Sequence, residues 1–306
     1  MKLTIFCSSI YVSLLAGIWP LSMAQAQVIP DQTLGSENSV VTPDVINGIA
    51  SDRLDGGAIR GSNLFHSFQE FSVREGRGAY FANPAGIANI FSRVTGGNIS
   101  QILGTLGVLG NANLYFLNPN GILFGPNAQL DVKGSFLATT ADSFQFPNAY
   151  GFSASNPTAP PLLTINIPIG LNFRENTTAT ISNQGTLKTG QDLVLAGNNL
   201  NLQGHLEAGN NLTLMATDTV TIRDSLTDPF IAAAWGDLTI QGDKTVDIFA
   251  LNHPDSGLFS LGNMILRSAE QVGGDAHFWS GGNFRIERLD GSLGKLYSPH
   301  DPVIRT

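Results

Sequence analysis

The segment GQDLVLAGNNLNLQGHLEAGNNLTL, residues 190–214, shows the repeat pattern that indicates the fold most clearly. In it, a glycine and an Asn or Asp come shortly before a leucine that opens a short run of alternating apolar and polar residues. The same corner occurs five times, followed by Leu193, Leu212, Leu238, Met264 and Phe284. These positions lie 19, 26, 26 and 20 residues apart. A repeat near 20 residues that holds two or three very short strands predicts a solenoid.

Parallel stacking explains how strands this short gain stability. Each strand pairs with the rungs above and below it and buries alternate Leu, Val and Ile in a continuous interior. Glycine and Asn are expected at the corners because they tolerate the left-handed backbone of a sharp bend. We expect the longer repeats to carry loops outside the column at residues 224–230 and 251–256. The pattern favours a parallel β-helix, although alternation alone leaves a β-sandwich open.

Asparagines recur next to the corners. Asn198, Asn199, Asn210 and Asn211 are expected to form hydrogen-bonded stacks between rungs rather than a binding surface. Before the repeats, residues 27–166 show short alternating segments interrupted by glycine and by Asn-Pro, which favours strands and tight turns. Only residues 84–93 and 136–144 leave room for a helical turn or two.

Composition supports this all-β prediction and limits the partners. The chain of 306 residues contains 34 glycines, and its hydrophobic fraction of 42% exceeds that of a disordered chain. Charged residues make up 13%, and the net charge is −8. Because no overall basic field exists, the sequence argues against nucleic acid as a partner.

The first 26 residues differ from the rest of the chain. Lys2 gives a positive start, residues 3–21 are mostly apolar, and Ala24-Gln25-Ala26 supplies a small-x-small cleavage pattern. This arrangement predicts a secretory signal peptide over residues 1–26 rather than a membrane anchor, since the apolar stretch is short and interrupted. The one cysteine, Cys7, lies inside it, so the mature chain can form no disulfide and no thiolate metal site.

No catalytic or metal-binding constellation stands out in the sequence. The five histidines are His66, His205, His253, His277 and His300. None pairs with another at metal-ligand spacing, so each is expected at the surface or in a turn. We therefore predict no metal, no cofactor and no catalytic residue.

Two features keep carbohydrate chemistry open. Parallel β-helices include lyases and glycosidases, and a glycosidase needs two facing carboxylates. The repeats offer the isolated acids Asp192, Glu207, Asp218, Asp237 and Asp243. In addition, Trp235 and Trp279 could form an exposed platform for sugar stacking, or pack in the solenoid core. A carbohydrate-active β-helix enzyme is therefore the alternative to a non-enzymatic protein.

Three stretches together resemble a known family. They are RGSNLFHSF at residues 60–68, GNANLYFLNPNGILFG at residues 110–125 and GSFLATTAD at residues 134–142. Between about residues 40 and 142 the chain closely resembles the N-terminal secretion domain of filamentous haemagglutinin-type proteins, in its cyanobacterial form. This resemblance implies a right-handed parallel β-helix with an N-terminal β cap. It also implies two-partner secretion (TPS), in which a TpsB-like outer-membrane transporter reads the domain through its own periplasmic domains.

The resemblance further implies the domain plan and the destination. Residues 27–165 would be the TPS domain, with the cap and first rungs, and residues 166–306 would continue the β-helix repeats. The protein would act as a secreted or surface-held adhesin, with surface glycans or other cells as partners. A secretion module truncated before its effector region remains open.

The motif that carries the resemblance has its own physical interpretation. Asn118-Pro119-Asn120-Gly121-Ile122 is strong turn chemistry, because Pro119 fixes φ and Asn120 and Gly121 accept positive φ. The sequence therefore leaves two compatible roles for this motif, a stabilising turn and a secretion determinant.

Overall fold

The computed structural model describes residues 27–147, 150–160, 170–174, 177–300 and 302–306. The predicted signal peptide, residues 1–26, and the predicted domain boundary between residues 165 and 166 lie outside the described residues. None of the helical segments in the described part of the chain has the length and apolar character that crossing a bilayer requires.

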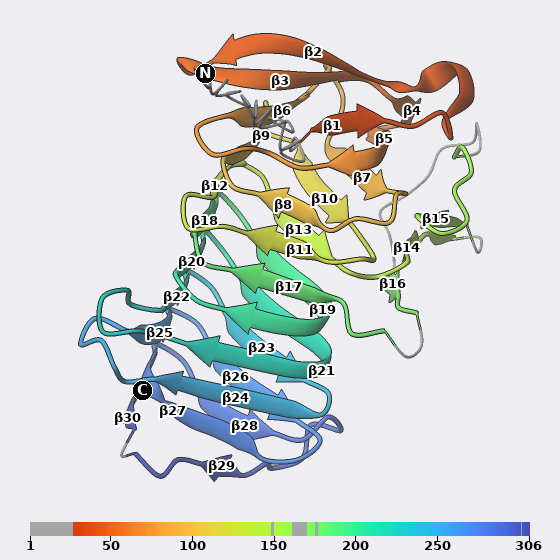
Figure 1. The fold of residues 1–306 in the computed structure, drawn as a ribbon. Helices are drawn as coiled ribbons and strands as arrows, with labels where there is room; N and C mark the ends of the chain where they lie inside the picture. Colours follow the sequence, from red (N-terminus) through yellow and green to blue (C-terminus); the bar gives the residue numbers. More distant parts are fainter. Residues whose placement is uncertain (1–26, 148–149, 161–169, 175–176, 301) are drawn as a thin grey trace, which may run out of the picture.

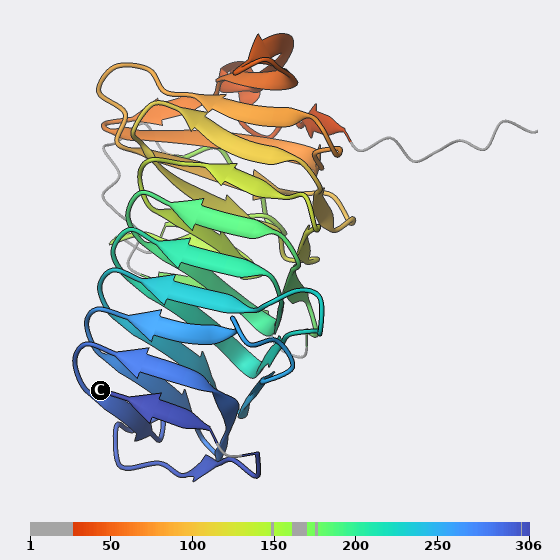
Figure 2. The ribbon, with the colours of Figure 1, turned by 90° about the vertical axis from the view of Figure 1, so that its left-hand side faces the viewer.

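The chain winds into a column with three faces of parallel strands (Figures 1 and 2). Face 1 contains β5 (Asn63–Phe71), β7 (Asn89–Val94), β10 (Asn113–Leu117), β13 (Phe136–Thr139), the first parts of β19 (Leu193–Leu202) and β21 (Leu212–Arg223), β23 (Leu238–Gly242), β26 (Met264–Ser268) and β28 (Phe284–Glu287). Face 2 contains β8 (Ser100–Ile102), β11 (Ile122–Phe124), β17 (Thr180–Asn183), the second parts of β19 and β21, β24 (Thr245–Ala250), the first part of β27 (Val272–Ser280) and β29 (Leu296–Tyr297). Face 3 contains β6 (Gly78–Ala82), β9 (Thr105–Leu109), β12 (Gln129–Asp131), β18 (Thr186–Thr189), β20 (His205–Ala208), β22 (Ile231–Ala234), β25 (Gly257–Ser260), the second part of β27 and β30 (Val303–Arg305).

The predicted fold class is confirmed: the protein is an all-β parallel β-helix with an N-terminal β cap. Alternate apolar residues from all three faces fill one continuous core along the column. The two predicted loops, residues 224–230 and 251–256, lie between strands as expected, but Phe230 at the end of the first packs into the core rather than outside the column. The two helical windows were wrong, since residues 89–94 and 136–139 are strands of face 1. Their alternating apolar residues pack into the column, and this packing overrides a weak local helical tendency.

A hydrogen-bond ladder follows the corner that precedes face 1. From Asn113 onward, a side-chain oxygen of each corner residue accepts the backbone N–H of the corner residue on the next rung. The chain of acceptors is Asn113, Ser135, Asp192, Asn211, Asp237 and Asn263, and Asn283 is the last donor. The distances are 2.8, 3.3, 3.1, 2.9, 2.7 and 3.0 Å. Side-chain amides extend the ladder upward, from Asn113 to Asn89 and from Asn89 to Asn63.

The glycines next to this ladder are required for space rather than for backbone φ. A Cβ on Gly236 would lie 2.5 Å from Asn211 Oδ1, and one on Gly262 would lie 2.2 Å from Asp237 Oδ1. Neither glycine has a positive φ. The expectation that corner glycines supply a left-handed backbone was therefore wrong at these positions, because here glycine allows a ladder oxygen to approach the next rung closely.

The ladder is expected to contribute measurably to the free energy of unfolding. Asp237→Ala removes the acceptor for the Asn263 backbone N–H and should lower the free energy of unfolding by about 1–2 kcal/mol. Asp237→Asn keeps an oxygen in place and should change it little. Asp255→Ala, in an exposed loop, is the matched control. Urea unfolding followed by circular dichroism checks this, and equal midpoints for Asp237→Ala and Asp255→Ala would contradict it.

The N-terminal segment closes the top of the column. The hairpin of β2 (Ser39–Ile46) and β3 (Ile49–Gly56) lies there, with β3 parallel to β6 (Figure 1). Strands β1 (Val28–Pro30) and β4 (Ala58–Arg60) pair antiparallel with β5. The cap thus hydrogen-bonds the first edge of the solenoid, which would otherwise be free to pair with another chain.

His66 sits beneath this cap and corrects the prediction that every histidine lies at the surface or in a turn. Its side chain is fully buried, contacts Ser39 Oγ at 3.0 Å through Nδ1 and packs against the rings of Phe68 and Phe81. Burial lowers the pKa of His66 to about 3, although the negative charge of Asp55 acts to raise it. The folded protein therefore holds this imidazole neutral.

This buried histidine predicts a pH dependence of stability. The unfolded chain binds a proton at His66 below pH 6.5 and the folded chain does not, so its contribution is complete above pH 6.5 and is lost as pH falls toward 3. The loss approaches about 1.4 kcal/mol per pH unit. His66→Phe should flatten the dependence between pH 6.5 and 4.5. An unchanged slope in unfolding experiments would contradict this, and His205, whose pKa burial also lowers, acts equally in both proteins.

One long excursion interrupts the column between β13 and β17. It contains a small antiparallel sheet of β14 (Ser143–Gln145), β15 (Gly151–Ser153) and β16 (Gly170–Asn172). This sheet lies beside the column (Figure 1). Its aromatic residues form a second core against the outer side of face 1, with Phe144, Phe146 and Phe152 around Phe65 and Phe91. Nothing in the corner repeats signalled this excursion.

Candidate functional site

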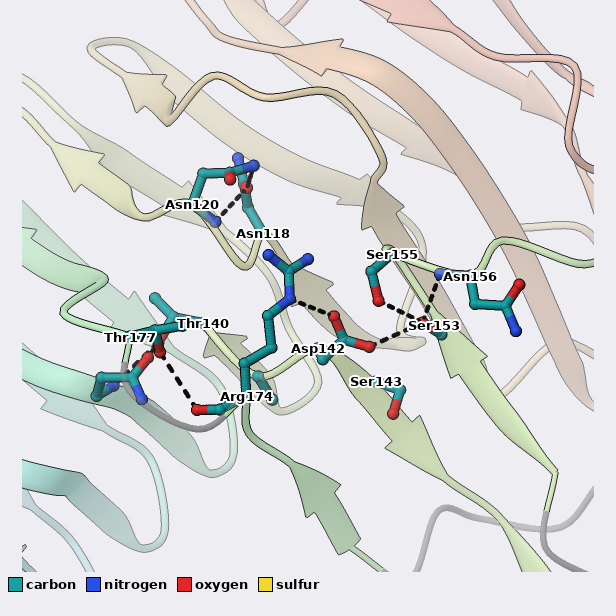
Figure 3. A network of polar contacts seen from close by, with 12 residues as sticks. Asn118, Asn120, Thr140, Asp142, Ser143, Ser153, Ser155, Asn156, Arg174 and Thr177 are labelled. Atoms are coloured by element: carbon teal, nitrogen blue, oxygen red, sulfur yellow. Dashed lines mark hydrogen bonds and ion pairs between the residues drawn. The ribbon is translucent and has the colours of Figure 1, made fainter.

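The motif at residues 118–122 forms the corner between β10 of face 1 and β11 of face 2. On the next rung, the equivalent corner is where the chain leaves the column for the excursion. The motif therefore lies beside the base of that excursion, as Figure 3 shows for Asn118, Asn120, Asp142 and Arg174.

Asn118 is the internal anchor of this corner. Its side chain is fully buried, and Nδ2 donates to the Asn98 carbonyl at 3.0 Å and to Ser100 Oγ at 2.9 Å. Its Oδ1 accepts the backbone N–H of Asn120 at 3.0 Å, and its own N–H donates to Thr139 O on the next rung. One side chain thus joins the turn to the preceding rung, while its backbone joins the following one.

The other residues of the motif complete the bend. Asn120 is half-buried and donates from Nδ2 to Gly96 O at 2.7 Å. Gly121 has φ +129°, a value that favours glycine, and a Cβ there would lie 3.1 Å from Thr180 O. Pro119 is buried, and Ile122 points into the core as the first residue of β11. The motif is therefore a stabilising turn in the structure.

A groove of about 620 Å³ opens beside the motif. Its walls include Ile99, Asn120, Leu123, Arg174 and Thr178. Ile99 is 43% exposed, and Leu123 is half-buried on the outer side of β11. We call Ile99, Leu123 and Arg174 the lip of the groove. The lip, rather than the buried Asn118, is what a partner can touch. This lip could not be predicted from the sequence, because Arg174 lies far along the chain from Ile99 and Leu123.

An ion pair ties the two ends of the excursion at this groove. Arg174 Nε donates to Asp142 Oδ1 at 2.6 Å, and Ser153 Oγ donates to Asp142 Oδ2 at 2.9 Å (Figure 3). Burial acts to raise the pKa of Asp142, but hydrogen bonds from Ser155, Arg174 and Ser153 outweigh it and hold the pKa below its usual range. The carboxylate stays charged and keeps Arg174 at the groove.

A buried arginine joins the excursion to the cap. Arg93 is fully buried, donates to Ser67 Oγ, Thr33 Oγ1 and Ser153 O, and lies 4.2 Å from the centre of the Phe152 ring. Burial lowers its pKa to about 10, which still leaves it charged at neutral pH. Ser67 Oγ in turn donates to Asp31 Oδ2, in the residue that follows β1. The cap, the column and the excursion therefore share one polar network, which sequence reasoning did not foresee.

The two tryptophans lie elsewhere, on face 3 of the lower rungs, and the structure brings them to one groove. Trp235 is 65% exposed, and Trp279 is half-buried and stacks on Phe259. Neither occupies the solenoid core. Hydrogen bonds between rungs, as predicted for the asparagines, are found for Asn198 with Thr140 and Thr217, and for Asn210 and Asn211 with Asp192. Asn199 pairs with the next rung through its backbone, at Thr219.

The geometry of the motif predicts unequal effects of two similar substitutions. Asn118→Ala leaves Asn98 O, Ser100 Oγ and the Asn120 N–H without their partner, and should lower the free energy of unfolding by about 2–3 kcal/mol. Asn120→Ala loses mainly the bond to Gly96 and should cost about 1 kcal/mol. Asn127→Ala, an exposed amide bound to Glu75, serves as the control. Denaturant midpoints that rank Asn120→Ala above Asn118→Ala in cost would contradict this geometry.

Comparisons with known proteins agree with this architecture. A profile of the TPS secretion domain matches residues 26–286. The heme/hemopexin-binding protein of Haemophilus influenzae (strain ATCC 51907 / DSM 11121 / KW20 / Rd) is 28% identical over 174 residues, which is 57% of this chain and 18% of that protein. A heme/hemopexin-binding protein from Haemophilus influenzae is 37% identical over 75 residues, 24% of this chain and 8% of the relative.

The chain thus spans less than a fifth of the length of these relatives in the matched region. The family match, in contrast, covers well over half of the chain and runs through the cap, the motif corner and most of the rungs. This chain belongs to the TPS secretion domain family, whose members are secreted through the outer membrane by two-partner secretion.

Proposed function

We propose that residues 27–165 are the address that a TpsB-like outer-membrane transporter binds through its periplasmic domains, and that residues 166–306 continue the solenoid of a surface or secreted adhesin. The observation that carries the secretion part of this proposal is the family match over residues 26–286, which includes the motif corner, and the limit at residue 165 is part of the proposal. A signal peptide at residues 1–26 would deliver the chain to the periplasm.

In this proposal, some residues of the secretion address maintain its shape and others contact the transporter. Asn118 cannot touch a partner because it is fully buried, so its role in our proposal is to hold the corner. The lip, Ile99, Leu123 and Arg174, offers two apolar side chains and one cation at the surface of the groove. An interface needs such accessible apolar anchors with a charged rim. We therefore assign transporter contact to the lip.

The stacked rungs also favour export in one direction, because folding outside the membrane can hold the emerged part of the chain there. Each rung exposes an edge on which the next can pair, so residues that emerge first would template those that follow. Folding outside the membrane would then oppose back-sliding of the chain. The cap supports this by closing the opposite end, where the first rung would otherwise be open.

Adhesion is favoured over carbohydrate cleavage because the acids that the sequence offered have structural partners. Asp192 and Asp237 are acceptors in the corner ladder. Glu207 pairs with Lys188 at 2.7 Å, and Asp218 lies 3.7 Å from Lys244. Asp243 accepts from Gln241. The ligands named for the Haemophilus proteins belong to much longer chains, so we propose surface glycans or other cells as partners here.

Secretion from cells with and without a co-expressed TpsB-like transporter from the same organism tests the address. Wild type should reach the medium only when the transporter is present. The double variant Ile99→Ser, Leu123→Ser should fold normally, remain in the periplasm and bind the purified periplasmic domains about tenfold more weakly, as expected for the loss of two apolar contacts.

Leu226→Ser is the control, because Leu226 is 81% exposed in a loop far from the motif. It should be secreted like wild type. Secretion without the transporter would overturn the pathway. Normal secretion of the folded lip variant would overturn the assignment of contact to the lip.

A further inference from the structure

The groove that contains both tryptophans is built from side chains in register on face 3. Backbone pairing places Glu207, Ala233, Phe259, Trp279 and Arg305 beside one another on successive rungs, one residue from each of β20, β22, β25, β27 and β30. These strands lie next to one another down one side of the column (Figure 1). The groove has a volume of about 580 Å³, within the range of small-ligand sites.

Two aromatic rings form a rigid stack in this row. The rings of Phe259 and Trp279 are parallel within 1°, and their centres are 4.5 Å apart. Gly257 makes room for both, since a Cβ there would lie 2.4 Å from the Trp279 ring and 2.9 Å from the Phe259 ring. The stack therefore requires a glycine at position 257, and the two rings are stacked without a ligand.

The stack is incomplete at Ala233. Neighbouring strands lie about 4.8 Å apart, which is close to the spacing of stacked rings. On the rung before Phe259, however, the row carries only the methyl group of Ala233. Trp235, 65% exposed, borders the same groove, and Glu207 lies on the rung that precedes Ala233. The result is a gap of one ring between an aromatic face and a carboxylate.

We propose that this gap binds one pyranose ring of a glycan. A pyranose ring has an apolar C–H face, which packs on an aromatic side chain, and a rim of hydroxyl groups. In the gap, its apolar face lies on Phe259 beside Trp235, and its hydroxyl groups donate to the Glu207 carboxylate. The groove thus offers both surfaces that a sugar ring needs.

The charge at Glu207 decides between a sugar and a purely apolar occupant. Glu207 is held by Lys188 at 2.7 Å and by His205 at 3.6 Å, and remains partly exposed. A hydrocarbon chain or an apolar face of a second copy would remove the water molecules that donate to this carboxylate and would offer no donors in their place. Burying the charge in this way is costly. Sugar hydroxyls supply the missing donors. Glu207 is also the one side-chain carboxylate among the described residues of the groove, whereas hydrolysis would need two.

This inference deepens the proposed adhesin role by naming the ligand class and its site. Its test is independent of secretion, because mature protein can be purified from the periplasm of cells that lack the transporter. The chain has three tryptophans, and Trp19 lies in the predicted signal peptide. The remaining two, Trp235 and Trp279, both line the groove, so tryptophan fluorescence reports on this site alone.

Titration with cellohexaose, mannohexaose and chitohexaose, followed by fluorescence and by isothermal calorimetry, tests the proposal. Wild type should bind at least one of them saturably. Ala233→Phe should fill the gap with the protein's own ring, and Phe259→Ala should remove the stacking face, each weakening binding about tenfold or more. Leu226→Ala, at the exposed loop, should bind like wild type with an unchanged circular dichroism spectrum.

Two results would overturn the proposal. The first is that no hexasaccharide binds folded wild-type protein, or that Ala233→Phe binds as wild type does. The second is a doubled mass in sedimentation velocity that Ala233→Phe abolishes, because the groove would then be a contact between two copies. Retention of the folded lip variant in the periplasm would still support the secretion address in either case.

Discussion

From Asn113 down the column, a side-chain oxygen at one corner of a rung accepts the backbone N–H of the next rung, and this contact aligns the rungs with one another. It sets the register between rungs. A slip of one residue would turn every strand's core side chains outward. With the register fixed, the leucines after each corner meet in one core, and outward residues align in rows. The stack of Phe259 on Trp279 is one such row, so even the candidate glycan groove follows from the ladder.

Much of this fold could be predicted from the sequence because solenoid repeats are local. The corners before Leu193, Leu212 and Leu238 carry a glycine and an Asn or Asp within a few residues, and each marks one rung. The ladder's upper part was missed, because the glycines there, Gly86 and Gly110, stand three residues before Asn89 and Asn113 rather than one or two. The role of the corner glycines was misjudged, since the need for space at Gly236 appears only when two rungs are stacked. The excursion was also missed, because its aromatic residues pack against Phe65 and Phe91 of face 1, a contact that exists only once the rungs are stacked.

The candidate site was only partly accessible to sequence reasoning. The turn at residues 118–122 could be located because Asn-Pro-Asn-Gly chemistry is local. Its burial could not, since the partners of Asn118 lie on the preceding rung at Asn98 and Ser100. The same holds for Arg93, whose partners come from the cap and from the excursion. Phe259 was overlooked as the partner of Trp279 because their contact depends on strand register alone.

The most direct test of the ladder is native-state hydrogen exchange at the corner amides. The backbone N–H groups of Asn211, Asp237, Asn263 and Asn283 donate to side-chain oxygens in the ladder at exposed or half-buried positions. The account predicts that they exchange as slowly as the amides of the adjoining strands, because they open only when rungs separate. Exchange at the rate of an exposed loop amide, such as that of Leu226, would contradict it.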